Sequence, residues 1–190
     1  SETYYDRIHS IYELVTGNPK KILITPIGNL FYKLPPKDHL LRSYINLRAG
    51  DTLPPEEVYQ YLSVSGYAQT AQTRSIGEFS MRGSIIDIFT PGIKNPIRVN
   101  FDENIIERIS VFDENTQLTL TTLDESKVLP IAYFDTSDLT IDTFKGNFRK
   151  YIAENIHDSV IYQKISNKFI PKEIEDFIPL FFKETSLLNE

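Results

Sequence analysis

The sequence contains no cysteine and no tryptophan, and its glycines are few and widely spaced. The lack of cysteine excludes disulfide bonds and thiolate metal sites, which fits a reducing compartment, and we predict a cytoplasmic location. No apolar run approaches the ~18 residues of a transmembrane helix, so we expect no membrane partner. The opening residues Ser1–Asp6 are polar and acidic, which is not the pattern of a signal peptide.

Motifs for phosphate binding and catalysis are missing as well. The eight glycines are never closer than six positions apart, which excludes both G-x-G-x-x-G and the G-x-x-x-x-G-K-[ST] phosphate loop. His9, His39 and His157 are far apart in the sequence and form no metal-binding motif, and there is no G-x-S-x-G elbow. We therefore predict that this chain has no cofactor, no metal and no enzymatic activity.

The charge balance argues against a protein that mainly binds nucleic acid. The net charge is -6, whereas phosphate contacts need clustered lysine and arginine. Between residues 67 and 112 there are five basic and five acidic residues, so this segment carries no net charge. A neutral segment with a few placed arginines favours a protein partner. With 190 residues and 41% hydrophobic content, the chain can bury the core of one large or two small domains.

The N-terminal part reads as helix, strand and helix. Apolar residues recur at helical spacing over residues 3–16, and the short run Lys21–Ile24 predicts a buried strand. Thr25 and Pro26 form a good N-cap and first turn for a helix through Leu34. This order indicates an α/β layer, but too few strands are present to complete a parallel sheet. We expect a partial piece of a larger fold.

The middle of the chain predicts a β-meander preceded by a helix. Residues 44–50 read as a strand, and Asp51 or Thr52 is expected to cap a helix that ends at Gly66. Three β-rich segments separated by turn residues follow between Ile76 and Phe112, which is typical of antiparallel strands.

The C-terminal part predicts helices and an apolar end. A helical stripe begins near Ser137, and a second short helix is expected over residues 157–167. The apolar residues 178–182 need a surface to cover them, so this end either folds back or continues into further chain. The predicted class is α+β: a central, mostly antiparallel β-meander domain (52–134) with packed helices, flanked by partial α/β segments (1–51 and 135–190).

Two arginines stand out in the meander. Strand alternation predicts that Val99 and Phe101 face the core while Arg98 and Asn100 face outward, which makes Arg98 a displayed cation. Arg82 lies in a turn beside a glycine. An alternative is that each arginine forms an internal ion pair, for example with Asp87 or Glu78, or covers apolar surface with its aliphatic part.

Several phrases in the chain are more specific than any periodicity. The phrases GEFSMRGSIIDIFTPG, PIRVNF and IERISVFDENTQ follow one another in this order, and IYQKISNKFIPKEIEDFIPLFF comes later. Together they resemble the central interaction domain shared by the nucleotide excision repair protein UvrB and the bacterial transcription-repair coupling factors, and the last phrase is similar to the coupling factors in particular. The resemblance runs from about Asp6 to Phe182. It implies that the flanks are remnants of a degenerate RecA-like domain.

The resemblance also implies a partner and a site. In the coupling factors two arginines and an aromatic residue of this domain contact UvrA, and the arginines match Arg82 and Arg98. The aromatic position is occupied by Asp102, which follows Phe101, so the implied UvrA-binding residues are Arg82, Arg98, Phe101 and Asp102. Phe101 would replace the missing aromatic group only if the strand register shifted.

The same resemblance implies further partners, and two alternative functions stay open. The parent's other domains would contact this module, while DNA and RNA polymerase would be bound, and ATP used, by parent domains outside this chain. One rival is UvrB itself, which is disfavoured because residues 34–52 leave no room for its damage-verifying hairpin and because residues 179–182 end as in the coupling factors. The other rival is a nucleic-acid-binding module.

Overall fold

A computed structural model describes residues 2–17, 22, 24–27, 33–152, 156, 158–171, 174–183 and 186–187. The helices are α1 (Glu2–Thr16), α2 (Lys37–Arg42), α3 (Pro55–Val64), α4 (Asp138–Tyr151), α5 (Val160–Ser166) and the 3-10 helix η2 (Glu175–Phe181). The strands are β1 (Lys33–Leu34), β2 (Ile45–Arg48), β3 (Ala68–Gln69), β4 (Glu78–Arg82), β5 (Ile85–Ile88), β6 (Ile97–Asp102), β7 (Ile105–Phe112), β8 (Thr119–Leu123), β9 (Glu125–Val128) and β10 (Ser186–Leu187). The predicted α+β class is confirmed.

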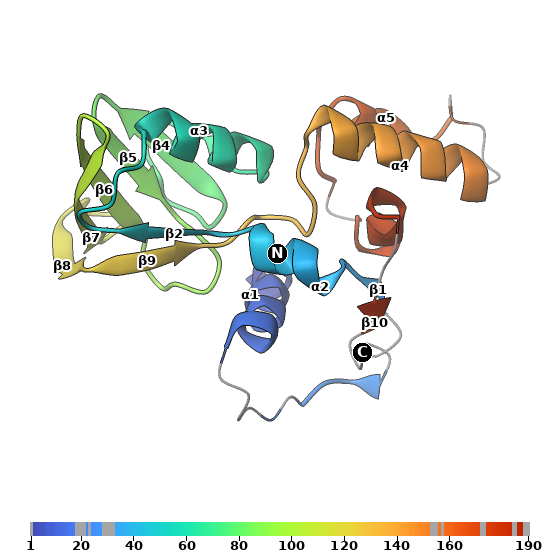
Figure 1. Cartoon of the computed structure of the whole chain (residues 1–190), viewed down its shortest axis with the longest axis horizontal. Helices are drawn as coiled ribbons and strands as arrows, with labels where there is room; N and C mark the ends of the chain where they lie inside the picture. The colour runs from blue at the N-terminus through green and yellow to red at the C-terminus, as the bar shows by residue number, and fades with distance from the viewer. Residues whose placement is uncertain are drawn as a thin grey trace.

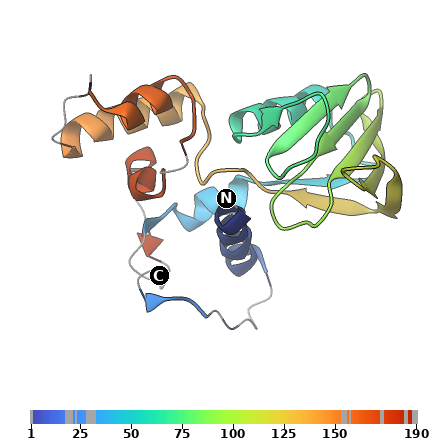
Figure 2. The same cartoon turned by 180° about the vertical axis from the view of Figure 1, so that it is seen from behind.

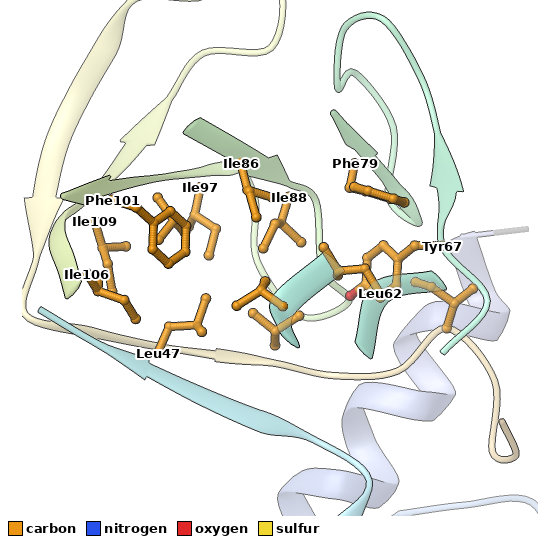
Figure 3. Packing of buried hydrophobic residues seen from close by; sticks show 14 residues of the cluster. Leu47, Leu62, Tyr67, Phe79, Ile86, Ile88, Ile97, Phe101, Ile106 and Ile109 are labelled. Carbon is orange, nitrogen blue, oxygen red and sulfur yellow. The ribbon is translucent and has the colours of Figure 1, made fainter. Parts of the chain in front are cut away.

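A β-rich unit occupies one end of the molecule, and α4 and α5 occupy the other, as both views show (Figures 1 and 2). Within the described residues, a six-stranded sheet has the order β3-β4-β5-β6-β7-β8, and all its neighbours are antiparallel except β3 and β4. Helix α3 packs Val58 and Leu62 against the buried face of this sheet, and β2 adds Leu47 through its pairing with β9 (Figure 3). The sheet therefore has a core face and an outer face.

The predicted meander is confirmed, with one strand more than expected. The segment from Ile76 to Phe112 contains β4 to β7, because Gly83 and Ser84 form a two-residue loop between Arg82 and Ile85, which pair with each other. Gly83 has a φ of 58°, a conformation that residues with a side chain rarely adopt. This tight loop places Arg82 at the end of a strand.

The N-terminal expectations are confirmed only in part. Helix α1 is present, and its buried residues contact Leu129 and Tyr133. The expected buried strand is wrong at Ile22 and Ile24, which are exposed and in no strand, and Lys21 and Leu23 lie outside the described residues.

The helix expected from Thr25 to Leu34 is also wrong at its end. Residues 33–34 form strand β1, which pairs with β10, while residues 28–32 lie outside the described part of the chain. Helix α2 was not predicted. Pro35 and Pro36 read as a helix stop, but Pro36 is the N-cap residue of α2, a position where its missing N–H group costs nothing.

The strand expected over residues 44–50 is confirmed as β2, and the following helix is confirmed as α3 with a different start. Pro54 is its N-cap residue, and Thr52 instead forms an isolated β-bridge with Ile105. The division of the chain at residues 52 and 134 stays a prediction.

The C-terminal part folds back onto itself. The helix predicted to begin near Ser137 is confirmed as α4, and Ser137 caps it by accepting a hydrogen bond from the Thr140 backbone N–H. Helix α5 begins at Val160, later than expected; of the earlier residues in the expected helix, His157 lies outside the described residues. Phe181 of η2 stacks on Phe134 with ring centroids 3.6 Å apart, so the apolar end is covered by this chain.

Candidate partner-binding site

The candidate site lies on the outer face of the central sheet, where strands β4, β5 and β6 run side by side. Ile97, Val99 and Phe101 of β6 are buried in the core, and Arg98 and Asn100 between them point to the other face. The predicted orientation of Arg98 is therefore confirmed. In the register of β5 and β6, Asp87 is the direct partner of Arg98. Directly opposite residues have neighbouring side chains, so this register brings the two charges together.

Asp87 holds both arginines. Its side chain is fully buried and accepts hydrogen bonds from Arg98 Nε at 2.7 Å and from Arg98 Nη2 at 2.9 Å. Arg82 Nη2 donates to the same carboxylate, at 2.9 Å from Oδ2. The alternative of an internal ion pair with Asp87 is thus realised for both arginines. Glu78 serves a different purpose, since it accepts from the backbone N–H groups of Arg74 and Ser75.

Arg98 is the more enclosed arginine. Its guanidinium lies 4.4 Å from the centroid of the Phe112 ring, and Nη2 also donates to Gln117 Oε1 at 3.3 Å. The hydrogen bonds to Asp87 raise the pKa of Arg98 further above its usual value, although burial opposes this shift. The prediction that Arg98 is a displayed cation is wrong: only 19% of its side chain is exposed, and Arg98 is mainly a fixed charge beneath the surface.

Arg82 is the more accessible arginine. Half of its side chain is exposed, and the hydrogen bond to Asp87 is the one it makes within the described part of the chain. Two arginines around one aspartate give the cluster a net charge of +1, on a chain whose net charge is -6. The site can therefore receive an anionic or carbonyl group through charge-assisted hydrogen bonds, chiefly from Arg82.

Phe101 is a core residue. Its side chain is 4% exposed and lies among the other core residues (Figure 3). The pairing of β6 with β7 does shift after Asn100, but the extra residue, Glu107, is on β7. The alternation along β6 therefore continues, and the shift does not turn Phe101 outward. The structure does not bring Phe101 to the outer surface with the arginines.

Within the described part of the chain, Asp102 forms no hydrogen bond or ion pair with either arginine. It is exposed at the end of β6, where it pairs with Ile105. Four positions along a strand separate it from Arg98 by about 13 Å. Sequence reasoning did not assign Phe112 or Gln117 to the site, although both contact Arg98. Alternation along the strands places residues 87 and 98 off the core face, but the pairing between them depends on the register of β5 and β6.

Metal-binding groups, membrane-spanning helices and cavities would each indicate another kind of site beside the arginine pair, within the described residues. Among the described residues there is no group of three or more metal-ligating side chains. The same residues include no helix that is long and apolar enough to cross a membrane. A cavity of about 490 Å³ is lined by residues such as Tyr5, Ile131 and Glu175, and it does not include Arg82 or Arg98.

Comparison with known proteins defines the class of this module. Residues 45–134 match the family model of the UvrB interaction domain. This range runs from β2 to β9 and contains both arginines and Asp87. This segment is therefore similar to UvrB interaction domains.

The similarity to particular proteins extends over nearly the whole chain. The transcription-repair-coupling factor of Rickettsia typhi is 34% identical over 183 residues, which are 96% of this chain and 16% of that protein. The factor of Haemophilus influenzae is 32% identical, over 98% of this chain and 16% of its own length. The Escherichia coli factor is 29% identical, over 94% and 15%. These matches confirm the resemblance read from the motifs: the chain corresponds to a segment of transcription-repair coupling factors and spans about 16% of the length of such relatives.

Proposed function

We propose that this chain is the UvrA-docking module of a transcription-repair coupling factor, and that its parent protein uses it to recruit UvrA to stalled transcription complexes. The observation that carries the proposal is the pair of arginines joined by Asp87 on the outer face of a UvrB interaction domain. In this proposal the chain is a scaffold without catalysis of its own. Residues 1–51 and 135–190 are the flanking remnants of a RecA-like domain.

The proposed docking contact is a charge-assisted hydrogen bond from Arg82 to an acidic or carbonyl group of UvrA. Arginine is enriched among residues that carry most of the binding energy at interfaces, and truncating such a residue costs about 2 kcal/mol or more. Arg98 supports this contact from below, since most of its surface is covered by Asp87, Phe112 and Gln117. Phe101 and Asp102 have indirect roles. Phe101 supports the fold of β6, and Asp102 lies at the edge of the proposed UvrA-binding surface.

Titration calorimetry of the chain with UvrA from the same organism tests this proposal. Arg82→Ala is the informative variant because Asp87 keeps its two hydrogen bonds to Arg98, so the fold is preserved. We expect a loss of about 2 kcal/mol, or about 30-fold in affinity.

The matched control is Arg48→Ala, which removes an exposed arginine that pairs with Glu125 away from the outer-face cluster. It is expected to bind like the wild type. A folded wild-type chain that does not bind UvrA would contradict the proposed function. Equal losses in Arg82→Ala and Arg48→Ala would contradict the proposed site.

A further inference from the structure

We propose that Asp87 is a positioning residue of the docking surface: its buried carboxylate fixes the two guanidinium groups so that Arg82 presents its remaining N–H groups to a carboxylate of the partner. This inference rests on the proposed function. It assigns the role of organising the site to a residue that no partner can touch, because Asp87 is fully buried.

The anchor itself is held firmly. Asp87 lies inside β5, with Ser80 of β4 and Arg98 of β6 as its direct partners across the sheet. Thr73 is fully buried, and its one hydroxyl is shared between two acceptors, the backbone oxygen of Asp87 at 3.3 Å and Ser80 Oγ at 3.2 Å. Because Asp87 lies on a central strand and its backbone oxygen accepts from a buried hydroxyl, its carboxylate cannot follow the motion of an exposed side chain. The arginines therefore adapt to Asp87.

The two arginines share one carboxylate oxygen. Arg98 Nε takes Oδ1, while Arg98 Nη2 and Arg82 Nη2 both donate to Oδ2 at 2.9 Å. Two guanidinium groups at such close range repel each other, and the repulsion is offset by the negative charge between them. If this charge were removed, the half-exposed Arg82 would turn away from Arg98 into solvent.

The hydrogen-bond geometry also determines what Arg82 can offer. A guanidinium is planar and carries five N–H donors in a fixed fork. Within the described residues, Arg82 uses Nη2 on Asp87, and its Nε and Nη1 donors have no protein partner. The hydrogen bond at Nη2 fixes the position of one nitrogen and so limits the positions that the other donors can reach. Whichever of its two N–H bonds Nη2 uses on Asp87, the other still forms a parallel pair of donors with either Nη1 or Nε. A partner carboxylate is the ligand whose geometry and charge match such a pair, and a pre-oriented pair loses less entropy on binding.

Charge and orientation predict opposite effects when Asp87 is neutralised. The wild-type cluster has a net charge of +1, and Asp87→Asn raises it to +2. If the arginines acted only as positive charge, an acidic partner would bind Asp87→Asn as tightly as the wild type or more tightly. If Asp87 positions them, binding weakens although the positive charge has increased. The sign of the change separates the two explanations.

Glu78 provides a matched control in the adjacent strand. Glu78→Gln removes the same single negative charge, but Glu78 caps the backbone N–H groups of Arg74 and Ser75 and does not contact the arginine pair. In calorimetry with UvrA, we expect Asp87→Asn to bind at least about tenfold more weakly than the wild type, while Glu78→Gln binds within about twofold of it. A folded Asp87→Asn chain that binds as tightly as the wild type or more tightly would overturn the inference.

A measurement on the free chain covers the case in which Asp87→Asn does not fold or UvrA does not bind. In NMR spectra of the arginine side chains, the wild type is expected to show restricted rotation about the Cζ–Nη bonds for both Arg82 and Arg98, because each donates to Asp87 from Nη2. Slow exchange of the Nε–H proton is expected for Arg98 alone of the two, since its Nε also donates to Asp87. Exposed Arg48 serves as the mobile reference. A held Arg82 without UvrA binding would support positioning and refute the proposed function. An Arg82 as mobile as Arg48 would refute positioning, whatever UvrA does.

Discussion

Removing Arg98 is expected to destabilise the chain far more than removing Arg82. Arg98→Ala deletes the bidentate partner of a fully buried carboxylate and also the cation that lies 4.4 Å from the Phe112 ring centroid. Arg82→Ala deletes a single hydrogen bond from a side chain that is half exposed. The two variants thus remove the same charge from the same carboxylate in very different environments.

The magnitudes follow from burial. Breaking a buried ion pair by removing one partner costs about 3–5 kcal/mol, because the remaining charge is left uncompensated. Arg82 still neutralises part of Asp87 in the Arg98→Ala variant, so we expect the lower end, about 3 kcal/mol. The ion pair between half-exposed Arg82 and Asp87 contributes less to the free energy of unfolding, and Arg82→Ala is expected to cost below about 1 kcal/mol.

Urea unfolding followed by circular dichroism measures both values as changes in the free energy of unfolding. The double variant Asp87→Asn/Arg98→Met completes a thermodynamic cycle, and its loss is expected to be clearly smaller than the sum of the losses of its two single variants. The reasoning would be refuted if Arg98→Ala cost no more than Arg82→Ala. It would also be refuted if the losses of the single variants Asp87→Asn and Arg98→Met added up to the loss of the double variant.

Three further outcomes are expected. Phe101→Ala costs about 3–5 kcal/mol in urea unfolding because it empties a core position, and a cost under 1 kcal/mol would contradict the core assignment. Asp102→Ala, at an exposed strand end, stays within about 0.5 kcal/mol in the same assay, and a larger loss would show a contact that the structure lacks. Burial lowers the pKa of His39 below its usual 6.5, so its contribution to stability is fully present above about pH 6.5 and is lost as the pH falls toward its folded-state pKa. Unfolding free energies from about pH 7.5 to about pH 5 should therefore fall less steeply in His39→Gln, and equal slopes would contradict this.

Part of the site was predictable because it depends on local alternation. The sequence shows Val99 and Phe101 alternating with Arg98, and period-two alternation determines which residues face the core. The α+β class and the meander follow from the same kind of signal. The α2 helix was missed because the two prolines before it read equally well as the end of one helix or the start of another.

The role of Asp87 was not predictable in the same way. An acidic residue on the face away from the core is usually solvated, and nothing in the local sequence shows that this carboxylate is fully buried and paired with two arginines. Its pairing with Arg98 depends on the register between β5 and β6, which is determined by the turn between them and by packing of the whole sheet. Long-range register of this kind is a tertiary property, so the sequence left the internal ion pair and the docking contact as alternatives. The structure shows that the ion pair exists and that Arg82 is still half exposed.

The most direct test of the central claim is site-specific photo-crosslinking to UvrA from two positions on opposite faces of the interaction domain. Ser84 is exposed in the loop next to Arg82, and Gln60 is exposed on α3, which covers the core face of the sheet. With a photoreactive amino acid at each position in turn, we predict a crosslink to UvrA from position 84 and none from position 60. A crosslink from position 60 alone, or from neither position while both proteins are folded, would contradict the account.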